Sequence, residues 1–213
     1  MTAASPEPRW RRAPEARPAQ ILTAALEEFG AVGLTRARLE DIARRAGVSK
    51  GTIYVYFPDK ESLFREVVRS TVVQTIERAE QAPMVGTPTE QLTAFMQRYW
   101  AFLRTPAFGA IYRMVIAELR HFPELASFYS REVIARGMRL VVDIIRRGIA
   151  TGEFRAVDPE VAARAMTAMF ITHAAWCGDR ACFPQVGDRS DDQVLAEIQS
   201  LTLDTILRPR AAR

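Results

Sequence analysis

The stretch "AGVSKGTIYVYFPDK" (residues 46–60) decides the fold. Before it, Leu39, Ile42 and Ala43 fall on one face of a short helix. Gly47 permits the positive φ of a tight bend, and Ser49 is suited to the N-cap of a second helix, where its hydroxyl accepts a backbone amide two or three residues on. Two short helices joined by such a turn form a helix-turn-helix.

The second of these helices has an unusual outward face. A rotation of about 100° per residue turns Ile53 and Phe57 towards the core and places Tyr54 and Tyr56 on the flanks. The residues that point away from the core are Gly51, Thr52 and Val55. An exposed helix favours alanine, glutamate or lysine at such positions, so we expect this face to meet a partner.

The major groove of DNA suits these residue types. Glycine permits a close backbone approach, threonine bonds a base edge or a phosphate, valine contacts a thymine methyl, and tyrosine hydroxyls reach phosphates. Lys60, in the first turn of the next helix, opposes the helix dipole unless a phosphate lies there. The alternative, a helical corner with exposed aromatics, accounts for each residue singly but not for the set.

Residues 39–64, "LEDIARRAGVSKGTIYVYFPDKESLF", resemble the helix-turn-helix signature of the TetR/AcrR family of bacterial transcriptional regulators. The resemblance implies homodimers with an N-terminal three-helix DNA-binding domain and a larger helical domain for ligand binding and dimerisation. The residues expected to contact DNA are Arg38, Ser49, Lys50, Gly51, Thr52, Tyr54, Val55, Tyr56 and Lys60.

Two positions depart from the family pattern. Ala37-Arg38 stands where the family often has a Thr/Ser pair, which removes an N-cap worth about 1 kcal/mol but supplies a cation for phosphate. Val55 stands where a ring residue is frequent, so we expect a different base preference there.

Helical spacing between sparse glycines and prolines predicts an all-α protein of about nine helices. After a helix at about 60–80, the pattern indicates helices near 89–104, 108–120, 124–151, 159–177 and 191–207, the last two starting at Asp158-Pro159 and Ser190. We expect a flexible arm over 1–16, the helix-turn-helix domain over 17–64, the ligand and dimerisation domain over 65–208, and a tail over 209–213.

The composition narrows the function classes. The 213 residues are 48% hydrophobic and 25% charged, enough to bury a core, and no 18-residue apolar run or signal peptide is present, so a cytoplasmic protein without membrane contact is expected. Cys177 and Cys182 are expected to be free thiols. The two histidines, His121 and His173, lie far apart in sequence, so neither a metal site nor a catalytic set is readable, and no cofactor is expected.

The C-terminal part is rich in large apolar residues, most of which form core. By resemblance, some line a ligand cavity, and the candidates are Phe95, Tyr99, Tyr112, Met138, Met169 and His173. Such a lining implies a lipophilic or aromatic small molecule. His173 is either a satisfied core histidine or a polar contact for the ligand.

The last two helices resemble the family's dimerisation unit. One apolar stripe comprises Val194, Leu195, Ile198, Leu201, Thr202 and Thr205. A second comprises Ala162, Ala165, Met166, Met169 and His173. Two such helical pairs can form a four-helix interface, although the pattern leaves open which stripe faces the partner.

We therefore expect a ligand-responsive repressor that binds a palindromic operator in double-stranded DNA and leaves it when an effector binds. Two alternatives remain open. One is a helical enzyme or small-molecule carrier without duplex affinity, and the other is a TetR-like fold that responds to a partner protein.

Overall fold

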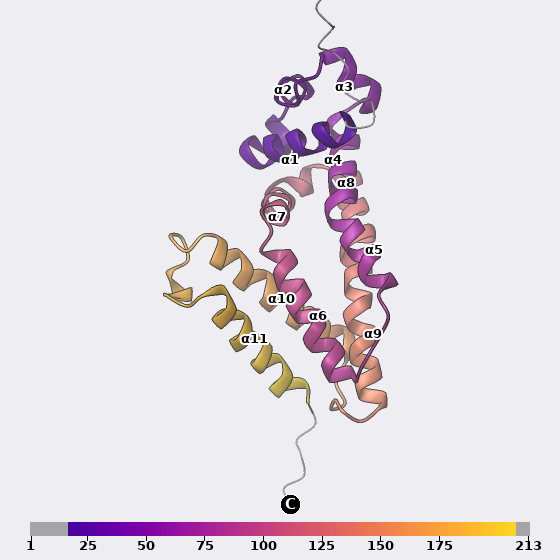
Figure 1. The fold of residues 1–213 in the computed structure, drawn as a ribbon, viewed down its shortest axis with the longest axis vertical. Helices are drawn as coiled ribbons and strands as arrows, with labels where there is room; N and C mark the ends of the chain where they lie inside the picture. Colours follow the sequence, from indigo (N-terminus) through magenta and orange to yellow (C-terminus); the bar gives the residue numbers. More distant parts are fainter. Residues whose placement is uncertain (1–16, 208–213) are drawn as a thin grey trace, which may run out of the picture. The chain divides into compact units, whose positions relative to one another are not determined.

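The computed structural model describes residues 17–207, which fall into two compact units divided between Val67 and Val68 (Figure 1). Within these residues, eleven α-helical segments form nine helices, because π-helical turns join α4 to α5 and α8 to α9. The described part contains no strand, only an isolated bridge between Phe154 and Leu207. The predicted all-α class and helix number are confirmed.

The arm expected over 1–16 and the tail over 209–213 lie outside the described residues. In chain order, the α-helices are α1 (Arg17–Arg36), α2 (Leu39–Arg45), α3 (Lys50–Tyr56), α4 (Lys60–Val68), α5 (Gln74–Gln81), α6 (Pro88–Leu103), α7 (Pro106–Glu118), α8 (Pro123–Tyr129), α9 (Arg136–Ala150), α10 (Pro159–Gly178) and α11 (Asp191–Ile206). The π-helical turns are η2 (Arg69–Val73) and η4 (Ser130–Ala135).

The first unit packs α1, α2, α3 and the start of α4 around a small core. The rings of Phe29 and Phe64 meet edge to face, with their centroids 6.1 Å apart, and both are fully buried. Arg45 of α2 donates to the buried carboxylate of Glu28 on α1 through Nη2 at 2.9 Å, which ties these helices together. Gly33, with φ at 80°, interrupts the helical backbone conformation within α1.

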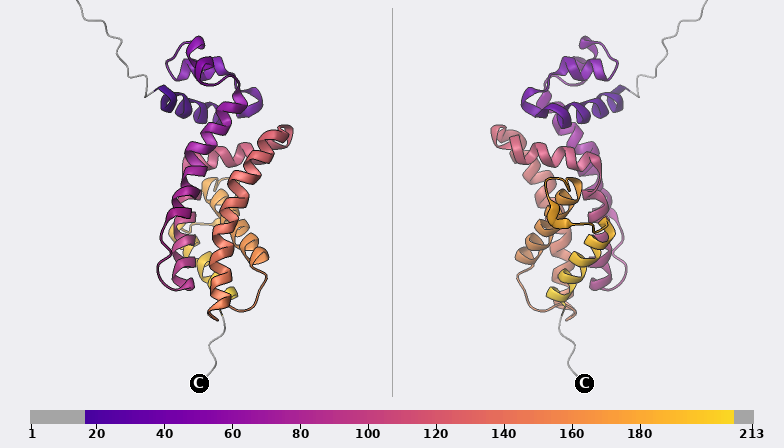
Figure 2. Two further views of the ribbon diagram at one scale, coloured as in Figure 1. Left: turned by 90° about the vertical axis from the view of Figure 1, so that its right-hand side faces the viewer. Right: turned by 90° about the vertical axis from the view of Figure 1, so that its left-hand side faces the viewer.

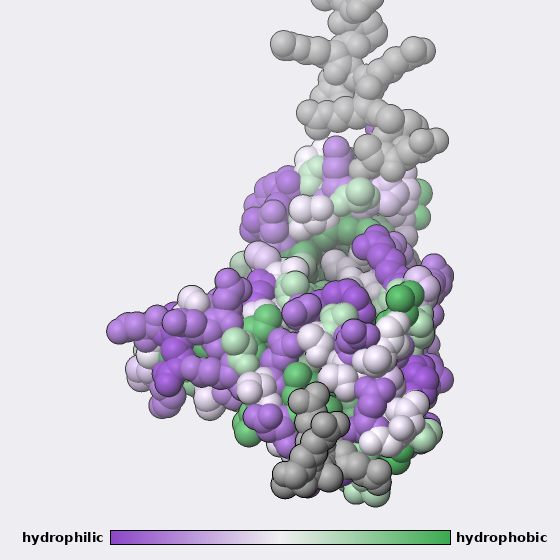
Figure 3. Space-filling model, turned by 60° about the horizontal axis from the view of Figure 1, so that its bottom comes forward, coloured by the Kyte–Doolittle hydropathy of each residue, from purple (hydrophilic) through white to green (hydrophobic). Residues whose placement is uncertain are grey.

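The second unit is a helical bundle in which α9 packs against α5, α6 and α10, while α11 packs against α6 and α10 (Figure 2). Its core includes Trp100 of α6, Ile145 of α9 and Phe170 of α10, all buried. On the face that Figure 3 presents, hydrophilic and hydrophobic side chains are intermixed over the bundle. None of the helices in the described part is both long and apolar enough to cross a membrane.

Local capping fixes where the helices of this bundle begin. Asp158 accepts the Val161 amide at 2.9 Å, and Ser190 accepts the Gln193 amide at 3.2 Å, as the sequence predicted. Thr87 and Thr105 cap α6 and α7 in the same way, each ahead of a proline at the first helical position. These caps satisfy amide groups that the helices leave without an internal partner.

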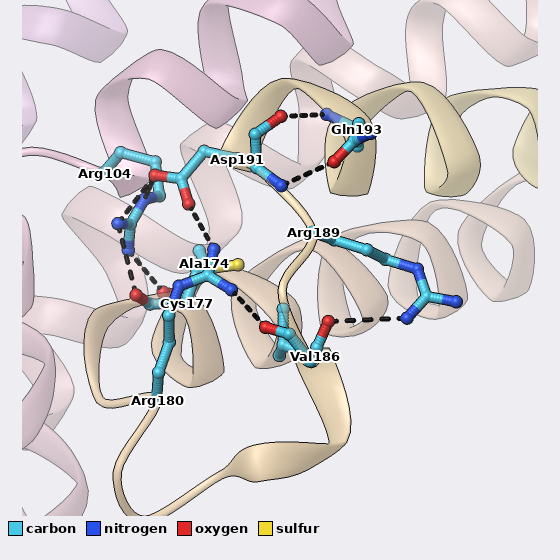
Figure 4. Close-up of polar contacts among 10 residues, drawn as sticks. Arg104, Ala174, Cys177, Arg180, Val186, Arg189, Asp191 and Gln193 are labelled. Carbon is cyan, nitrogen blue, oxygen red and sulfur yellow. Dashed lines mark hydrogen bonds and ion pairs between the residues drawn. The ribbon is translucent and has the colours of Figure 1, made fainter.

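The loop between α10 and α11 is held by arginines. Figure 4 shows Arg104, the C-cap residue of α6, and Arg180 approaching the Asp191 carboxylate, each at 2.8 Å. Arg104 also donates to the carbonyls of Ala174 at 2.8 Å and Cys177 at 3.4 Å, near the C-terminal end of α10. These contacts place cations where α10 ends and a carboxylate where α11 begins, as the two helix dipoles favour.

The structure also decides how the last two helices present their apolar residues. On α11, Val194, Ile198 and Thr202 are buried within the protein's own second unit, whereas Leu201 is 58% exposed. On α10, Met166 is buried, while Ala162, Met169 and His173 are half-buried. The exposed positions of α10 include the charged Glu160 and Arg164, and beside them runs a different stripe of small or branched residues: Val161, Ala165, Ala168, Thr172 and Ala175.

Candidate nucleic-acid interface

The turn between α2 and α3 has the local geometry that its sequence predicted. Gly47 adopts φ of 66°, a conformation that favours glycine. The Ser49 hydroxyl accepts the Thr52 amide at 3.1 Å and lies 2.8 Å from the Thr52 hydroxyl. The serine therefore fixes both the start of α3 and the orientation of one side chain on its outer face.

Side chains of α3 divide into a buried and an exposed set. Ile53 is fully buried and Phe57, which follows the helix, is 8% exposed, so the predicted inward pair is confirmed. Val55 is 82% exposed, and Tyr54 and Tyr56 are 42% and 37% exposed on its two sides. An exposed apolar side chain between two hydroxyl-bearing rings matches a groove in which a base edge lies between two phosphate rows.

A carboxylate that the sequence-based site lacks lies next to this face. Glu40, in the first turn of α2, accepts a hydrogen bond from the Tyr54 hydroxyl at 3.2 Å, and its Oε1 lies 2.8 Å from the Lys50 ammonium. The pKa of Glu40 is lowered to about 2 by hydrogen bonds to its carboxylate from Lys50, from the backbone amide of Glu40 itself and from the Tyr54 hydroxyl. The same contact raises the pKa of Lys50. No pattern within α2 marks Glu40, because both partners come from the next helix.

The remaining predicted DNA contacts lie at the ends of their helices. Arg38 is exposed at the N-cap of α2 and makes no capping bond, as expected from the loss of a serine or threonine there. Lys60, half-buried at the start of α4, donates to the carbonyl of Thr35 at 2.8 Å. This bond offers the ammonium an acceptor within the protein, so a phosphate contact by Lys60 stays a prediction.

The candidate ligand residues belong to four helices of the second unit. Phe95 and Tyr99 stack on α6 at 5.5 Å between centroids, and Tyr112 on α7 stacks on Phe108 at 5.7 Å. Met138 and Met169 pack, partly buried, against the same core. The His173 Nδ1 lies 2.8 Å from the Met169 carbonyl, which satisfies one ring nitrogen within α10.

Tyr129 also belongs to this aromatic group, although it is not among the ligand residues expected from the sequence. It is 6% exposed at the end of α8, and burial raises its pKa to about 12. Burial, followed by the nearby phenols of Tyr129 and Tyr112, likewise raises the pKa of Tyr99. The second unit therefore gathers three phenol groups from α6, α7 and α8.

A separate pocket of about 240 Å³ lies elsewhere in the second unit. It is lined by Arg69, Val73, Gln74, Glu77, Glu132 and Arg136, so none of the predicted ligand residues borders it. Arg136 bonds Glu80 through Nε at 3.0 Å and lies 3.6 Å from both Glu77 and Glu132. This pocket is polar, unlike the apolar lining that the sequence suggested.

Both parts of the chain match known families. Residues 21–67 match the family described as bacterial regulatory proteins, tetR family. Residues 90–205 match the C-terminal domain described for AefR-like transcriptional repressors.

Curated relatives include the HTH-type transcriptional repressor KstR2 of Mycolicibacterium smegmatis, 30% identical over 91% of this chain and 92% of the relative. Among solved structures, FadR from Bacillus subtilis in complex with stearoyl-CoA has a TM-score of 0.73 at 23% identity and covers 88% of this chain and 98% of its own. A regulator from Saccharomonospora viridis in complex with choline also has a TM-score of 0.73 at 23% identity, and covers 92% of this chain and 100% of its own. At that identity the two structures show a shared fold.

The helix-turn-helix geometry, the family matches over both units and the repressor relative agree. The chain belongs to the TetR family of bacterial transcriptional regulators, whose members bind DNA through the helix-turn-helix.

Proposed function

We propose that the protein is a dimeric repressor that binds a near-palindromic operator through α3 and leaves it when a lipophilic or aromatic molecule binds the second unit. The observation that carries this proposal is the outer face of α3, where Val55 is 82% exposed between two tyrosines. Valine is a poorer helix former than alanine, glutamate or lysine at an exposed position, whereas on DNA a thymine methyl would cover it.

In this proposal the DNA contacts divide into two kinds. Val55 and Thr52 read base edges, while Arg38, Tyr56 and the start of α4 meet the phosphate backbone. A twofold dimer places two copies of α3 in successive major grooves about one helical turn apart, so each half-site is read in the same way. Selection from a random duplex pool should therefore recover an inverted repeat.

Two substitutions separate these kinds of contact. Val55→Ala should alter the preference at one base step of each half-site while leaving the salt dependence unchanged. Arg38→Gln should weaken binding to all duplexes alike. It should also reduce the slope of log K against log salt concentration by about one, because one phosphate contact is lost. Fluorescence anisotropy on the selected duplex and on a shuffled duplex measures both. If wild type binds neither duplex, or binds without salt dependence, the DNA proposal is wrong.

The half-buried aromatic side chains of α6 and α7 support a lipophilic or aromatic effector. Phe95 and Tyr99 stack face to face, and Tyr99 lies 6.1 Å from the Phe170 ring of α10. The related FadR structure was solved with stearoyl-CoA, a lipophilic molecule. An effector acts on DNA affinity only by as much as it prefers one conformation over the other, so operator DNA must weaken effector binding by the same factor.

Thermal shift with stearoyl-CoA, with an aromatic compound set and with choline as a polar contrast tests the effector class. A ligand that binds only the native state raises the melting temperature. The proposal predicts a rise with lipophilic or aromatic compounds, lost in Phe95→Ala, together with release of the selected duplex. A ligand that binds the protein without changing its affinity for DNA would instead indicate a small-molecule carrier.

For the dimer, we propose α10 and α11 as the interface. The support is the exposed stripe of α10 together with Leu201 of α11, which lies 58% exposed next to a buried face. Thr172→Arg, in the centre of that stripe, should convert the dimer to a monomer in light scattering after size exclusion. Ala82→Arg, exposed in the loop after α5, is the matched control and should leave the dimer intact. A dimer that survives Thr172→Arg would place the interface elsewhere.

A further inference from the structure

A negatively charged side chain on a DNA-binding face needs a reason, and Glu40 is such a residue. Its side chain is 42% exposed in the first turn of α2, and it shares one carboxylate oxygen between the Lys50 ammonium at 2.8 Å and the Tyr54 hydroxyl at 3.2 Å. The Lys50 ammonium also lies 5.9 Å above the Tyr54 ring. These three side chains, from two helices, therefore form one connected group at the edge of α3.

Stability does not explain this arrangement. Exposed ion pairs contribute little to folding, because water screens them and two long side chains lose freedom, and the Lys50 side chain is 68% exposed. The arrangement also withholds two donors, Lys50 and Tyr54, that are suited to phosphate. It places an anion where the phosphates of DNA would approach, which disfavours binding to DNA of any sequence.

A carboxylate has a selective use in the major groove. It only accepts hydrogen bonds, so it is complementary to the amino groups of cytosine N4 and adenine N6. Guanine O6 and N7 and thymine O4 are acceptors themselves, so they repel it. At an amino-bearing base the carboxylate gains a donor, whereas on other sequences its repulsion remains.

We propose that Glu40 is a specificity-determining residue that accepts the amino group of a cytosine or adenine in each half-site and opposes binding to all other duplexes. Its contacts with Lys50 and Tyr54 hold the carboxylate in place for this task. This inference rests on the proposed function, in that α3 must enter the major groove of an operator.

The experiment selects duplexes from a random pool with wild type, Glu40→Ala and Asp41→Asn, and then measures anisotropy on the wild-type-selected duplex and on a shuffled duplex. Asp41→Asn removes the same charge one residue away, where the partner is Arg44, and is the control for bulk electrostatics. For Glu40→Ala we expect the ratio of specific to non-specific affinity to fall by about tenfold or more. One position of each half-site should also lose its preference for an amino-bearing base.

The possible outcomes separate this inference from the proposed function. If wild type selects no sequence, the proposed function fails. If wild type selects an operator and Glu40→Ala selects the same one with an unchanged affinity ratio, the operator function stands and the role of Glu40 is overturned. The same holds if Asp41→Asn lowers the ratio as much as Glu40→Ala does.

A double variant tests whether Glu40 contacts the base itself or acts only through its neighbour. If the effect of Glu40→Ala on base preference persists in a Lys50→Ala background, the carboxylate reads the base directly, as proposed. If the effect vanishes there, direct reading is overturned. Glu40→Gln, which keeps the side-chain size, should also reduce discrimination against the shuffled duplex, because the substitution removes the negative charge that opposes binding of that duplex.

Discussion

Gly148, near the end of α9, permits the close approach of a buried ring. A Cβ added at this position would overlap the Cδ2, Cε2 and Cγ atoms of Phe154. The Phe154 ring is 1% exposed, and its backbone amide donates to the Gly148 carbonyl at 2.9 Å, so neither side can move freely. Gly148→Ala must therefore displace a ring that the core holds on all sides.

The expected magnitude follows from two opposing effects. Overpacking a filled core costs about 1–3 kcal/mol, and a contact this short falls in the upper part of that range. The higher helix propensity of alanine relative to glycine offsets about 1 kcal/mol of this loss in the free energy of unfolding. We expect Gly148→Ala to lower the free energy of unfolding by about 1–2 kcal/mol and the melting temperature by about 2–8 °C.

A matched control lies on the same helix. At Gly137 an added Cβ would meet only Ile76 Cδ1 at 4.0 Å, an ordinary contact, so Gly137→Ala should raise stability by about 0.5–1 kcal/mol. Urea melts of both variants, at one fixed protein concentration, measure the difference. A Gly148→Ala protein as stable as wild type would refute the packing argument.

Three further predictions concern single side chains. Ser49→Ala removes the N-cap of α3 and should cost about 1 kcal/mol in urea melts, whereas Ser49→Asp should keep the stability but weaken DNA binding by its charge. The pKa of Tyr129, raised to about 12, lies above its value of about 10 in the unfolded chain. The stability from burying the neutral phenol is therefore fully present below pH 10. It is lost between pH 10 and 12, by roughly 2–3 kcal/mol. Urea melts over this pH range should show a smaller loss of stability for Tyr129→Phe than for wild type. Arg104→Met leaves the Ala174 carbonyl without its 2.8 Å donor and should cost about 1–3 kcal/mol by denaturant unfolding, while Arg155→Met, exposed, should be nearly neutral.

Local features of this protein were readable from its sequence. The cap at Ser49, the bend at Gly47 and the helix starts at Asp158 and Ser190 each depend on a few neighbouring residues, so the sequence contains their cause. The inward pair of α3 was predictable for the same reason, because the rotation per residue in a helix is fixed.

Only the tertiary structure decided how distant residues pair. Lys50 meets Glu40 across the turn between two helices, and Lys60 reaches the carbonyl of Thr35 on α1. The apolar stripe of α11 was visible in the sequence, but its burial at Ile198 within its own unit was not. A helical pattern states which residues share a face, whereas the neighbour that covers the face depends on how the chain brings separate helices together.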